Sequence, residues 1–457
     1  MHVLGRGSSM TTYNAQKYLA RFTCLQGDCT DTCCSGLHVG ITEDNYVQLK
    51  KTLSVDDRFK ERAEQFITIS PATEQDIATH PAHFGAILQD PDKGLCSFVD
   101  DEGGCDIHAT FGEETIGDVC SLYPRTIAEV NDDVHIFASM ACPEIARLVV
   151  TADDAFDDAD LDPDQVPRHR VHRTFQFDDH SSLYERAFHH INALVDFLLR
   201  HEDYPVDIRL VFVVTFGDIV NGGGFRRGAL HEDAFLLEDT LAAFQQKETL
   251  DKIEANYRAL SIPGEYGLLL ARNVFVARLR QQPAKNFTNV VNGVLFKRPP
   301  TTDELASFFD AGADHDAFAY SPEELWGTYA KNRAKLLEHF QSDINRYALH
   351  FIRHQWMTQW YSRSSSLPFF NAQTLVRLAL ARALLYLHPK MNAFFERVDA
   401  GDDRDGLVEQ LNEMAVESFH LVGKNIMHVP SFTSVVDAFI REQGLDELSR
   451  TVLLLPP

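Results

Sequence analysis

The sequence contains no apolar run long enough to cross a membrane. A transmembrane helix needs about 20 consecutive apolar residues, and the most apolar stretches, residues 209–220 and 374–387, are too short or are interrupted by arginine. We therefore expect no membrane partner. The first residues also lack the apolar stretch of a secretory signal, which indicates a cytoplasmic protein.

Basic residues are scarce compared with acidic ones. The chain has 42 Lys and Arg residues against 67 Asp and Glu residues, which gives a formal net charge of −25 at pH 7. Such a chain repels the phosphate backbone of nucleic acids, so we expect no nucleic-acid partner. We expect a partner with a basic protein surface instead, although an acidic surface can also serve only to keep a protein soluble.

Two signatures of nucleotide-binding and methyl-donor enzymes are missing. Residues 211–224 (VFVVTFGDIVNGGG) end in three glycines, but they do not form the Gly-x-Gly-x-x-Gly turn that opens a Rossmann helix. The radical S-adenosylmethionine signature Cys-x3-Cys-x2-Cys begins correctly at Cys29 and Cys33 but then reaches Gly36. The sequence therefore argues against both kinds of site.

Cysteine is absent from the chain after Cys142. The eight cysteines are Cys24, Cys29, Cys33, Cys34, Cys96, Cys105, Cys120 and Cys142. Most of them are surrounded by Gly, Asp, Ser and Pro, so separate loops can bring them together. We predict that residues 10–150 form a cysteine-rich metal-binding module with these eight cysteines as candidate ligands.

The spacing of the cysteines leaves four interpretations open. Disulfides are disfavoured because they concentrate in small secreted domains. Structural zinc prefers Cys-x2-Cys pairs, which this chain lacks. An iron–sulfur centre is held by thiolates and tolerates ligands from scattered loops, and structural thiols are the fourth alternative. Spacing does not say which of the eight would be ligands.

Helical periodicity dominates the rest of the chain. Apolar positions recur at three-to-four spacing in residues 181–201, 235–260, 322–361 and 373–387. Strand-like segments are brief, as at residues 38–42 and 134–138. We therefore predict a mainly α protein, with a helical C-terminal domain and a small irregular α+β cysteine-rich N-terminal module.

An aspartate-rich segment separates the two predicted parts. Residues 151–165 (TADDAFDDADLDPDQ) contain seven aspartates and a proline, a composition typical of a solvated linker. We therefore place the helical domain at residues 166–457.

Several residues near the cysteines are secondary candidates. Tyr123 and Arg125 could orient a ligand, but a Tyr-Pro-Arg sequence more often packs a turn. Glu144 is expected to cap the helix that contains it. His38 and His108 lie near cysteines, yet a lone histidine is usually a structural hydrogen-bonding residue.

The cysteines lie in short blocks with distinctive neighbours. The blocks are Arg21-Phe22-Thr23-Cys24, Cys33-Cys34-Ser35-Gly36, Cys96, Cys105-Asp106-Ile107-His108, Gly112-Glu113-Glu114, Cys120-Ser121-Leu122-Tyr123-Pro124-Arg125 and Cys142-Pro143-Glu144. In this order the blocks resemble the flagellin lysine-N-methylase (FliB) family. The resemblance covers residues 18–150, about a third of the chain.

The resemblance implies a 4Fe–4S cluster bound by cysteines. It also implies methylation of lysine side chains on flagellin, with S-adenosylmethionine as the methyl donor, and it leaves the helical domain to bind the substrate or the donor. A wider group of small zinc- or iron-chelating proteins has related Cys-x3-Cys-Cys blocks. A non-catalytic zinc- or iron-binding scaffold, or a redox protein, is therefore the alternative, and the sequence assigns no catalytic or donor-binding residue.

Overall fold

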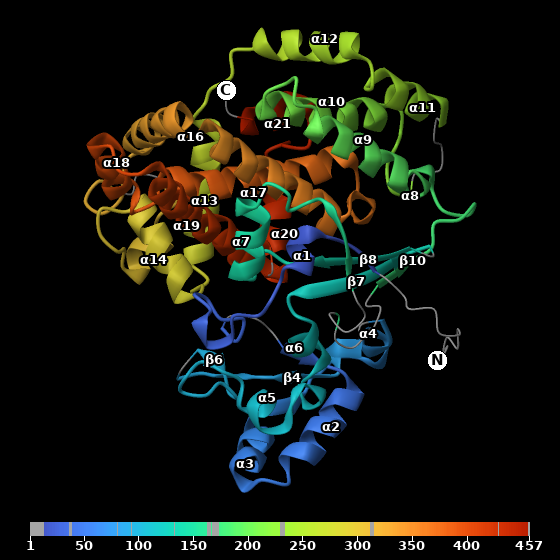
Figure 1. Cartoon of the computed structure of the whole chain (residues 1–457), viewed down its shortest axis with the longest axis vertical. Coiled ribbons are helices and arrows are strands. Elements are labelled where there is room, and N and C mark those ends of the chain that lie inside the picture. The colour runs from blue at the N-terminus through green and yellow to red at the C-terminus, as the bar shows by residue number, and fades with distance from the viewer. Residues whose placement is uncertain are drawn as a thin grey trace. The chain divides into compact units, whose positions relative to one another are not determined.

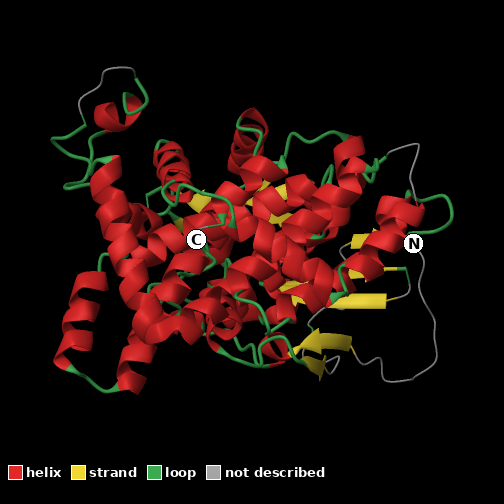
Figure 2. Cartoon of the chain, turned by 90° about the horizontal axis from the view of Figure 1, so that it is seen from above, coloured by secondary structure: helices red, strands yellow, loops and turns green. Residues whose placement is uncertain are grey.

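The computed structural model describes residues 13–35, 39–79, 81–92, 94–131, 133–161, 166, 173–228, 234–310, 315–427 and 429–455. The chain divides into two compact units. Unit 1 comprises Met1–Leu148 and Phe156–Phe175, and unit 2 comprises Val149–Ala155 and Gln176–Pro457. Helices dominate, and the strands are few and short (Figures 1 and 2). The predicted mainly α fold with a small strand-containing N-terminal region is confirmed.

Unit 1 combines short helices with short strands. Its helices are α1 (Lys17–Ala20), α2 (Glu43–Leu53), α3 (Asp57–Phe66), α4 (Glu74–Thr79), α5 (Asp106–Phe111) and α6 (Asp118–Leu122). Its strands are β1 (Tyr13–Gln16), β2 (Val39–Ile41), β3 (Ile67–Ile69), β4 (Gly85–Ile87), β5 (Gln89–Asp90), β6 (Leu95–Cys96), β7 (Arg125–Val130), β8 (Asp133–Ala138), β9 (Asp158–Leu161) and β10 (Arg173–Phe175). Helix α7 (Pro143–Thr151) begins in unit 1, and its last residues are counted in unit 2.

The strands of unit 1 form four small sheets. Their orders are β2-β4-β3, β10-β7-β8, β1-β9 and β5-β6. In the first sheet both neighbours of β4 run antiparallel to it, and Val39 and Ile67 both pair with Ile87. Helices α2 and α3 complete a core with this sheet, in which Leu49 and Phe59 are buried. Cys96 and Cys105 pack against this core.

Unit 2 is helical. Its helices are α8 (Leu183–Arg186), α9 (Phe188–Arg200), α10 (Val206–Gly222), α11 (Ala234–Ala243), α12 (Lys247–Arg258), α13 (Tyr266–Leu279), α14 (Lys285–Leu295), α15 (Thr302–Ala306), α16 (Pro322–Gln359), α17 (Leu367–Tyr386), α18 (Met391–Ala400), α19 (Arg404–Val422), α20 (Pro430–Glu442) and α21 (Leu448–Thr451). A π-helical turn, Gly423–Met427, follows α19.

Helix α17 is the centre of unit 2. It contacts α10, α13, α16 and α19, and Gln373 is its only residue that is not buried. A helix surrounded in this way must be apolar on every side, which explains why its sequence shows little contrast between faces. None of the helices among the described residues has the length and apolarity to span a bilayer.

The four predicted helical segments are helical, with three interruptions: a break between α8 and α9, a break between α11 and α12, and a kink in α16 at Phe340, whose backbone is not helical. Residues 181–201 contain α8 and α9, and residues 235–260 contain α11 and α12. The segment 322–361 becomes α16, whose start is fixed by a capping box: Ser321 accepts a hydrogen bond from the Glu324 N–H, and the Glu324 carboxylate accepts one from the Ser321 N–H.

The aspartate-rich segment lies partly outside the described residues. Within its described part, Asp158–Leu161 forms β9, which pairs antiparallel with β1. The Lys17 ammonium also pairs with the Asp157 carboxylate at 2.9 Å. The predicted boundaries at residues 150 and 165 stay predictions.

Two tyrosines join distant parts of unit 2. The Tyr184 hydroxyl donates to the Tyr361 carbonyl at 2.9 Å, and the Tyr361 hydroxyl donates to the Tyr184 carbonyl at 3.0 Å. Both residues are fully buried, and Trp356 and Trp360 are buried nearby in the sequence. These aromatic residues therefore pack in the core.

Replacing Tyr361 tests this reciprocal pair. Tyr361→Phe leaves the buried Tyr184 carbonyl without its donor, so the free energy of unfolding should fall by about 1–3 kcal/mol in urea denaturation. Tyr266→Phe is the control, because the Tyr266 hydroxyl makes no hydrogen bond with a described residue. Equal losses in both variants would contradict the stabilising role of the pair.

Candidate metal centre

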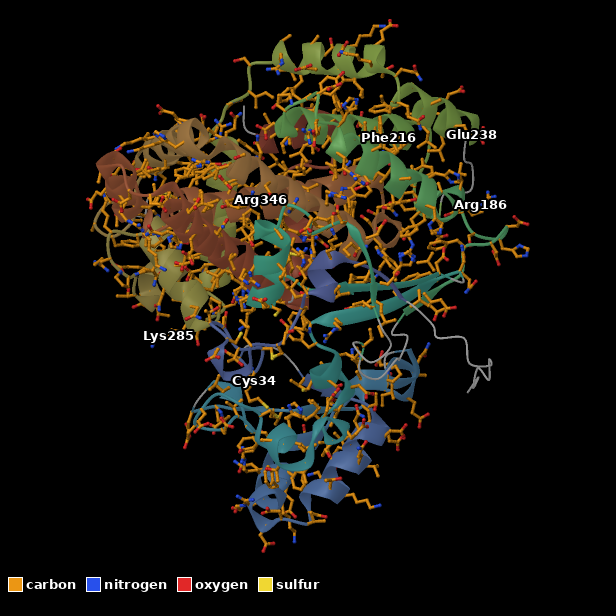
Figure 3. The ribbon with its side chains drawn as sticks, in the orientation of Figure 1. Cys34, Arg186, Phe216, Glu238, Lys285 and Arg346 are labelled. Atoms are coloured by element: carbon orange, nitrogen blue, oxygen red, sulfur yellow. The ribbon has the colours of Figure 1, made fainter. Side chains whose placement is uncertain are left out.

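All eight cysteines lie in unit 1, and the structure describes each of them. None forms a disulfide. Cys142 is buried, Cys29, Cys34, Cys96 and Cys105 are half-buried, and Cys24, Cys33 and Cys120 are exposed. Figure 3 labels Cys34. The disulfide interpretation therefore has no support from the structure.

Cys34, Cys96 and Cys105 are brought together by the backbone. The Cys96 N–H donates to the Cys34 carbonyl at 2.7 Å, next to an isolated antiparallel bridge between Ser35 and Leu95. The charges of Cys34 and Cys105 both act on Cys96, and the charge of Cys34 acts on Cys105. The three sulfurs therefore lie within Coulombic range of one another.

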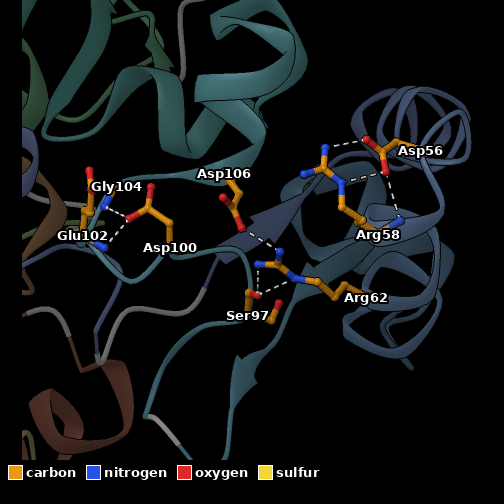
Figure 4. Close-up of polar contacts among 8 residues, drawn as sticks. All are labelled: Asp56, Arg58, Arg62, Ser97, Asp100, Glu102, Gly104 and Asp106. Carbon is orange, nitrogen blue, oxygen red and sulfur yellow. Dashed lines mark hydrogen bonds and ion pairs between the residues drawn. The ribbon is translucent and has the colours of Figure 1, made fainter.

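The loop before Cys105 is closed by Asp100. One carboxylate oxygen, Oδ1, accepts hydrogen bonds from the Glu102 N–H at 2.9 Å and from the Gly104 N–H at 2.7 Å (Figure 4). An isolated antiparallel bridge between Val99 and Cys105 ends the loop. This turn returns the chain toward β6, and so it places Cys105 near Cys96.

Arg62 of α3 holds the neighbours of both cysteines. Its Nε and Nη2 donate to the carbonyl of Ser97, which follows Cys96, at 3.1 and 2.6 Å. Its Nη1 pairs with Asp106, which follows Cys105, at 2.6 Å (Figure 4). Arg62 was not predicted from the sequence, because it lies outside every cysteine block and no neighbouring residue marks it.

Cys24, Cys29 and Cys142 form a second group. The charges of Cys29 and Cys24 act on Cys142, which precedes α7. Burial raises the pKa of Cys142 to about 12, while hydrogen bonds from the backbone amides of Ile145 and Glu144 oppose the rise. The first turn of α7 therefore directs amide N–H groups at this sulfur.

Cys33 connects the two groups. Its thiol donates a hydrogen bond to the Cys34 sulfur, which raises the pKa of Cys33 well above its usual range, and burial and the charges of Cys34, Cys120 and Cys24 add to this effect. Because the Cys33 residue is exposed, we attribute the raised pKa mainly to the neighbouring thiols. All eight cysteines are thus electrostatically connected, and we call them the thiol set.

The protonation of the thiol set bears on metal binding. Burial also raises the pKa of Cys96, to about 11. Thiols with raised pKa values stay protonated at neutral pH when no cation compensates their charge, whereas a metal binds thiolates. Metal binding to the thiol set would therefore release protons.

The thiol set is gathered but not arranged as a finished coordination shell. Among the described residues, no three His, Cys, Asp or Glu side chains are positioned together as ligands of a metal ion. The donor chemistry nevertheless fits iron–sulfur ligation, which uses thiolates. The assignment of the eight cysteines as ligands therefore stays a prediction.

Tyr123 and Arg125 lie close to the thiol set. The Tyr123 hydroxyl is buried and has no hydrogen-bond partner among the described residues. Burial raises its pKa, and the charges of Cys142 and Cys33 add to the rise. Burial lowers the pKa of Arg125, and the charge of Cys24 opposes this change. Tyr123 thus presents an unsatisfied polar atom where a bound group could meet it.

The remaining secondary candidates are Glu144, His108 and His38. Glu144 lies in the first turn of α7, as expected, and its carboxylate pairs with Arg147 at 2.6 Å. His108 is exposed on α5. His38 lies outside the described residues.

The chain is similar to curated proteins of one kind. Lysine-N-methylases of Salmonella typhimurium and Salmonella choleraesuis are each 26% identical to it over 144 residues, which is 32% of this chain and 34% of each relative. About a third of the chain is thus similar to lysine-N-methylases. These matches confirm the resemblance to the lysine-N-methylases that the cysteine blocks indicate.

A third similar protein is named for the flagellum. The flagellar biosynthetic protein FliU of Salmonella muenchen is 26% identical over 144 residues, which is 32% of this chain and 80% of that protein. The chain spans about a third of the length of the lysine-N-methylases that it matches. No family model matches the chain, and no solved structure matches it.

Replacing Arg62 tests how unit 1 positions Cys96 and Cys105. Arg62→Ala removes three donors to partly buried partners, so we expect unfolding to require about 1.5–3 kcal/mol less free energy, measured in guanidinium chloride. Arg58→Ala is the matched control on the same helix, because the exposed Arg58 side chain pairs with Asp56 and bonds to neither Ser97 nor Asp106 (Figure 4). It should cause little change, and an equally small effect of Arg62→Ala would contradict the role of Arg62.

Proposed function

We propose that the protein is an S-adenosylmethionine-dependent protein lysine N-methyltransferase that acts on flagellin. The thiol set, in a chain related to lysine-N-methylases, is the observation that carries this proposal. The relatives' names support lysine methylation, and the name of the FliU relative supports a flagellar substrate.

Four members of the thiol set would hold a 4Fe–4S cluster. Iron is favoured over zinc because the chain offers scattered thiolates and no Cys-x2-Cys pair. When bound, such a cluster would supply a cation that removes the mutual repulsion of the thiolates and links the segments of unit 1. Cys34, Cys96 and Cys105 come from segments that already meet through the backbone.

The reaction itself is a displacement at carbon. The lone pair of a neutral lysine Nζ forms a bond to the methyl carbon of the sulfonium, while the carbon–sulfur bond breaks and its electron pair stays on sulfur. The methylated ammonium then loses a proton to a base. Because free lysine has a pKa of about 10.4, the site must first favour its neutral form by desolvation or by a basic group.

The charge of the protein suits this substrate. A net charge of −25 attracts a lysine-bearing surface and speeds encounter at low salt. Eight cysteines without disulfides also suit the reducing cytoplasm, where we place the reaction.

Mass spectrometry tests the transferase proposal. Anaerobically purified protein, incubated with flagellin and S-adenosylmethionine, should add one or more methyl groups to flagellin lysines. Omitting the donor is one control, and a flagellin whose lysines are already dimethylated chemically is the other. Unmodified flagellin after prolonged incubation with protein that retains its iron would contradict the proposal.

Metal analysis tests the cluster. The protein as purified without oxygen should contain about four iron and four sulfide ions per chain, with a broad visible absorption. Cys33→Ser should lower both, because Cys33 is hydrogen-bonded to Cys34 of the first group and is affected by the charge of Cys24 of the second, whereas Ser97→Ala, beside Cys96, should lower neither. Stoichiometric zinc without sulfide would instead favour the alternative of a non-catalytic zinc-binding scaffold.

A further inference from the structure

Unit 2 contains a polar cavity of about 430 Å³ at the end of α10. Its wall is built from three stretches that are distant in sequence: the end of α10 with Arg226, the residues around Ser366 at the start of α17, and the α20–α21 region with Arg441 and Asp446. The volume falls within the usual range of small-molecule sites, about 300–1,000 Å³.

The wall is held by contacts that do not involve a ligand. Arg226 and Ser366 pair as an isolated antiparallel bridge, and the Ser366 hydroxyl accepts a hydrogen bond from the Phe369 N–H at the start of α17. The Arg441 guanidinium lies 4.0 Å from the centroid of the Phe369 ring. These contacts connect the three stretches, so the cavity belongs to the folded form of unit 2.

Charges of both signs line the cavity without neutralising one another. The arginines are Arg226 and Arg441, and the carboxylates are Asp218, Asp446 and Glu447. None of these five side chains forms an ion pair with another described residue. A ligand that carries an ammonium and a carboxylate at one end would satisfy both kinds of charge at once.

Two side chains of α10, Asn221 and Asp218, support a ligand site. The Asn221 Oδ1 lies in the cavity wall, is buried and has no hydrogen-bond partner among the described residues. A buried acceptor of this kind is costly unless something donates to it. Asp218 accepts a hydrogen bond from the Leu448 N–H, and burial raises its pKa.

We propose that this cavity binds the α-amino-acid end of the methyl donor, with Arg226 and Arg441 facing its carboxylate and Asp218 facing its ammonium. The inference rests on the proposed methyltransferase function, which requires a donor site, and on the absence of a Rossmann-type turn in this chain. Residues 211–224, which end in three glycines, are instead mostly part of α10.

Two ligands separate recognition of the amino-acid end from recognition of the nucleoside. S-adenosylhomocysteine carries the amino-acid end, and 5′-methylthioadenosine has the same nucleoside without it. Isothermal titration calorimetry should show that the wild-type chain prefers S-adenosylhomocysteine at least tenfold. Arg441→Gln and Asp218→Asn should each reduce this preference at least fivefold, with little change in binding of 5′-methylthioadenosine.

Arg200→Gln is the matched control, because Arg200 is exposed on α9 and lies outside the cavity wall. Circular dichroism melting of each variant establishes that it is folded, and Arg226→Gln serves as a second test at an exposed wall position. An unchanged preference in Arg226→Gln, Arg441→Gln and Asp218→Asn would overturn the inference.

The same measurements separate this inference from the proposed function. If the wild-type chain methylates flagellin while the cavity variants keep their preference, the donor binds elsewhere and only the cavity assignment fails. If the variants lose the preference but the wild type methylates nothing, the cavity assignment stands and the transferase proposal fails. A wild-type chain that binds neither ligand and transfers no methyl group would overturn both.

Discussion

Unit 1 depends on bringing eight thiols from separate segments into Coulombic range. The backbone achieves part of this, since the Cys96 N–H bonds to the Cys34 carbonyl at 2.7 Å and Arg62 fixes the residues that follow Cys96 and Cys105. The hydrogen bond between the Cys33 and Cys34 side chains raises the pKa of Cys33 far above its usual range, and burial and the charges of neighbouring thiols add to the rise. Without a cation, the thiols whose pKa is raised keep their protons at neutral pH. A bound cation would instead stabilise the thiolates and hold the segments that carry them together.

The two units are stabilised by different means. Unit 2 is built around α17, whose residues are nearly all buried, and an apolar helix of this length supplies a large hydrophobic contribution. Unit 1 has a small core between α2, α3 and the β2-β4-β3 sheet, and small cores often need an additional link such as a metal. The thiol set adjoins that core through Cys96 and Cys105. Metal loss should therefore affect unit 1 more than unit 2.

Short-range sequence signals predicted those helices whose ends depend only on residues close together in the chain. The predicted segment 322–361 begins where α16 begins, and the capping box of Ser321 and Glu324 that fixes this start needs only residues three positions apart. Helix α10 was not predicted, because a helix buried on nearly all sides has no polar face to reveal its period. The role of Arg62 and the cavity beside Arg441 could not be predicted either, since each depends on segments that only the fold brings together. The cysteine blocks identified the candidate centre, but side-chain geometry, which sequence spacing does not determine, decides which thiols could bind metal.

The central claim is that the thiol set surrounds an iron–sulfur cluster, and X-ray absorption at the iron edge of anaerobically purified protein tests it most directly. The account predicts iron coordinated by sulfur, together with a second shell of iron at the short distance found only within clusters. Iron surrounded by oxygen or nitrogen, or sulfur-bound iron without a neighbouring iron atom, would contradict it.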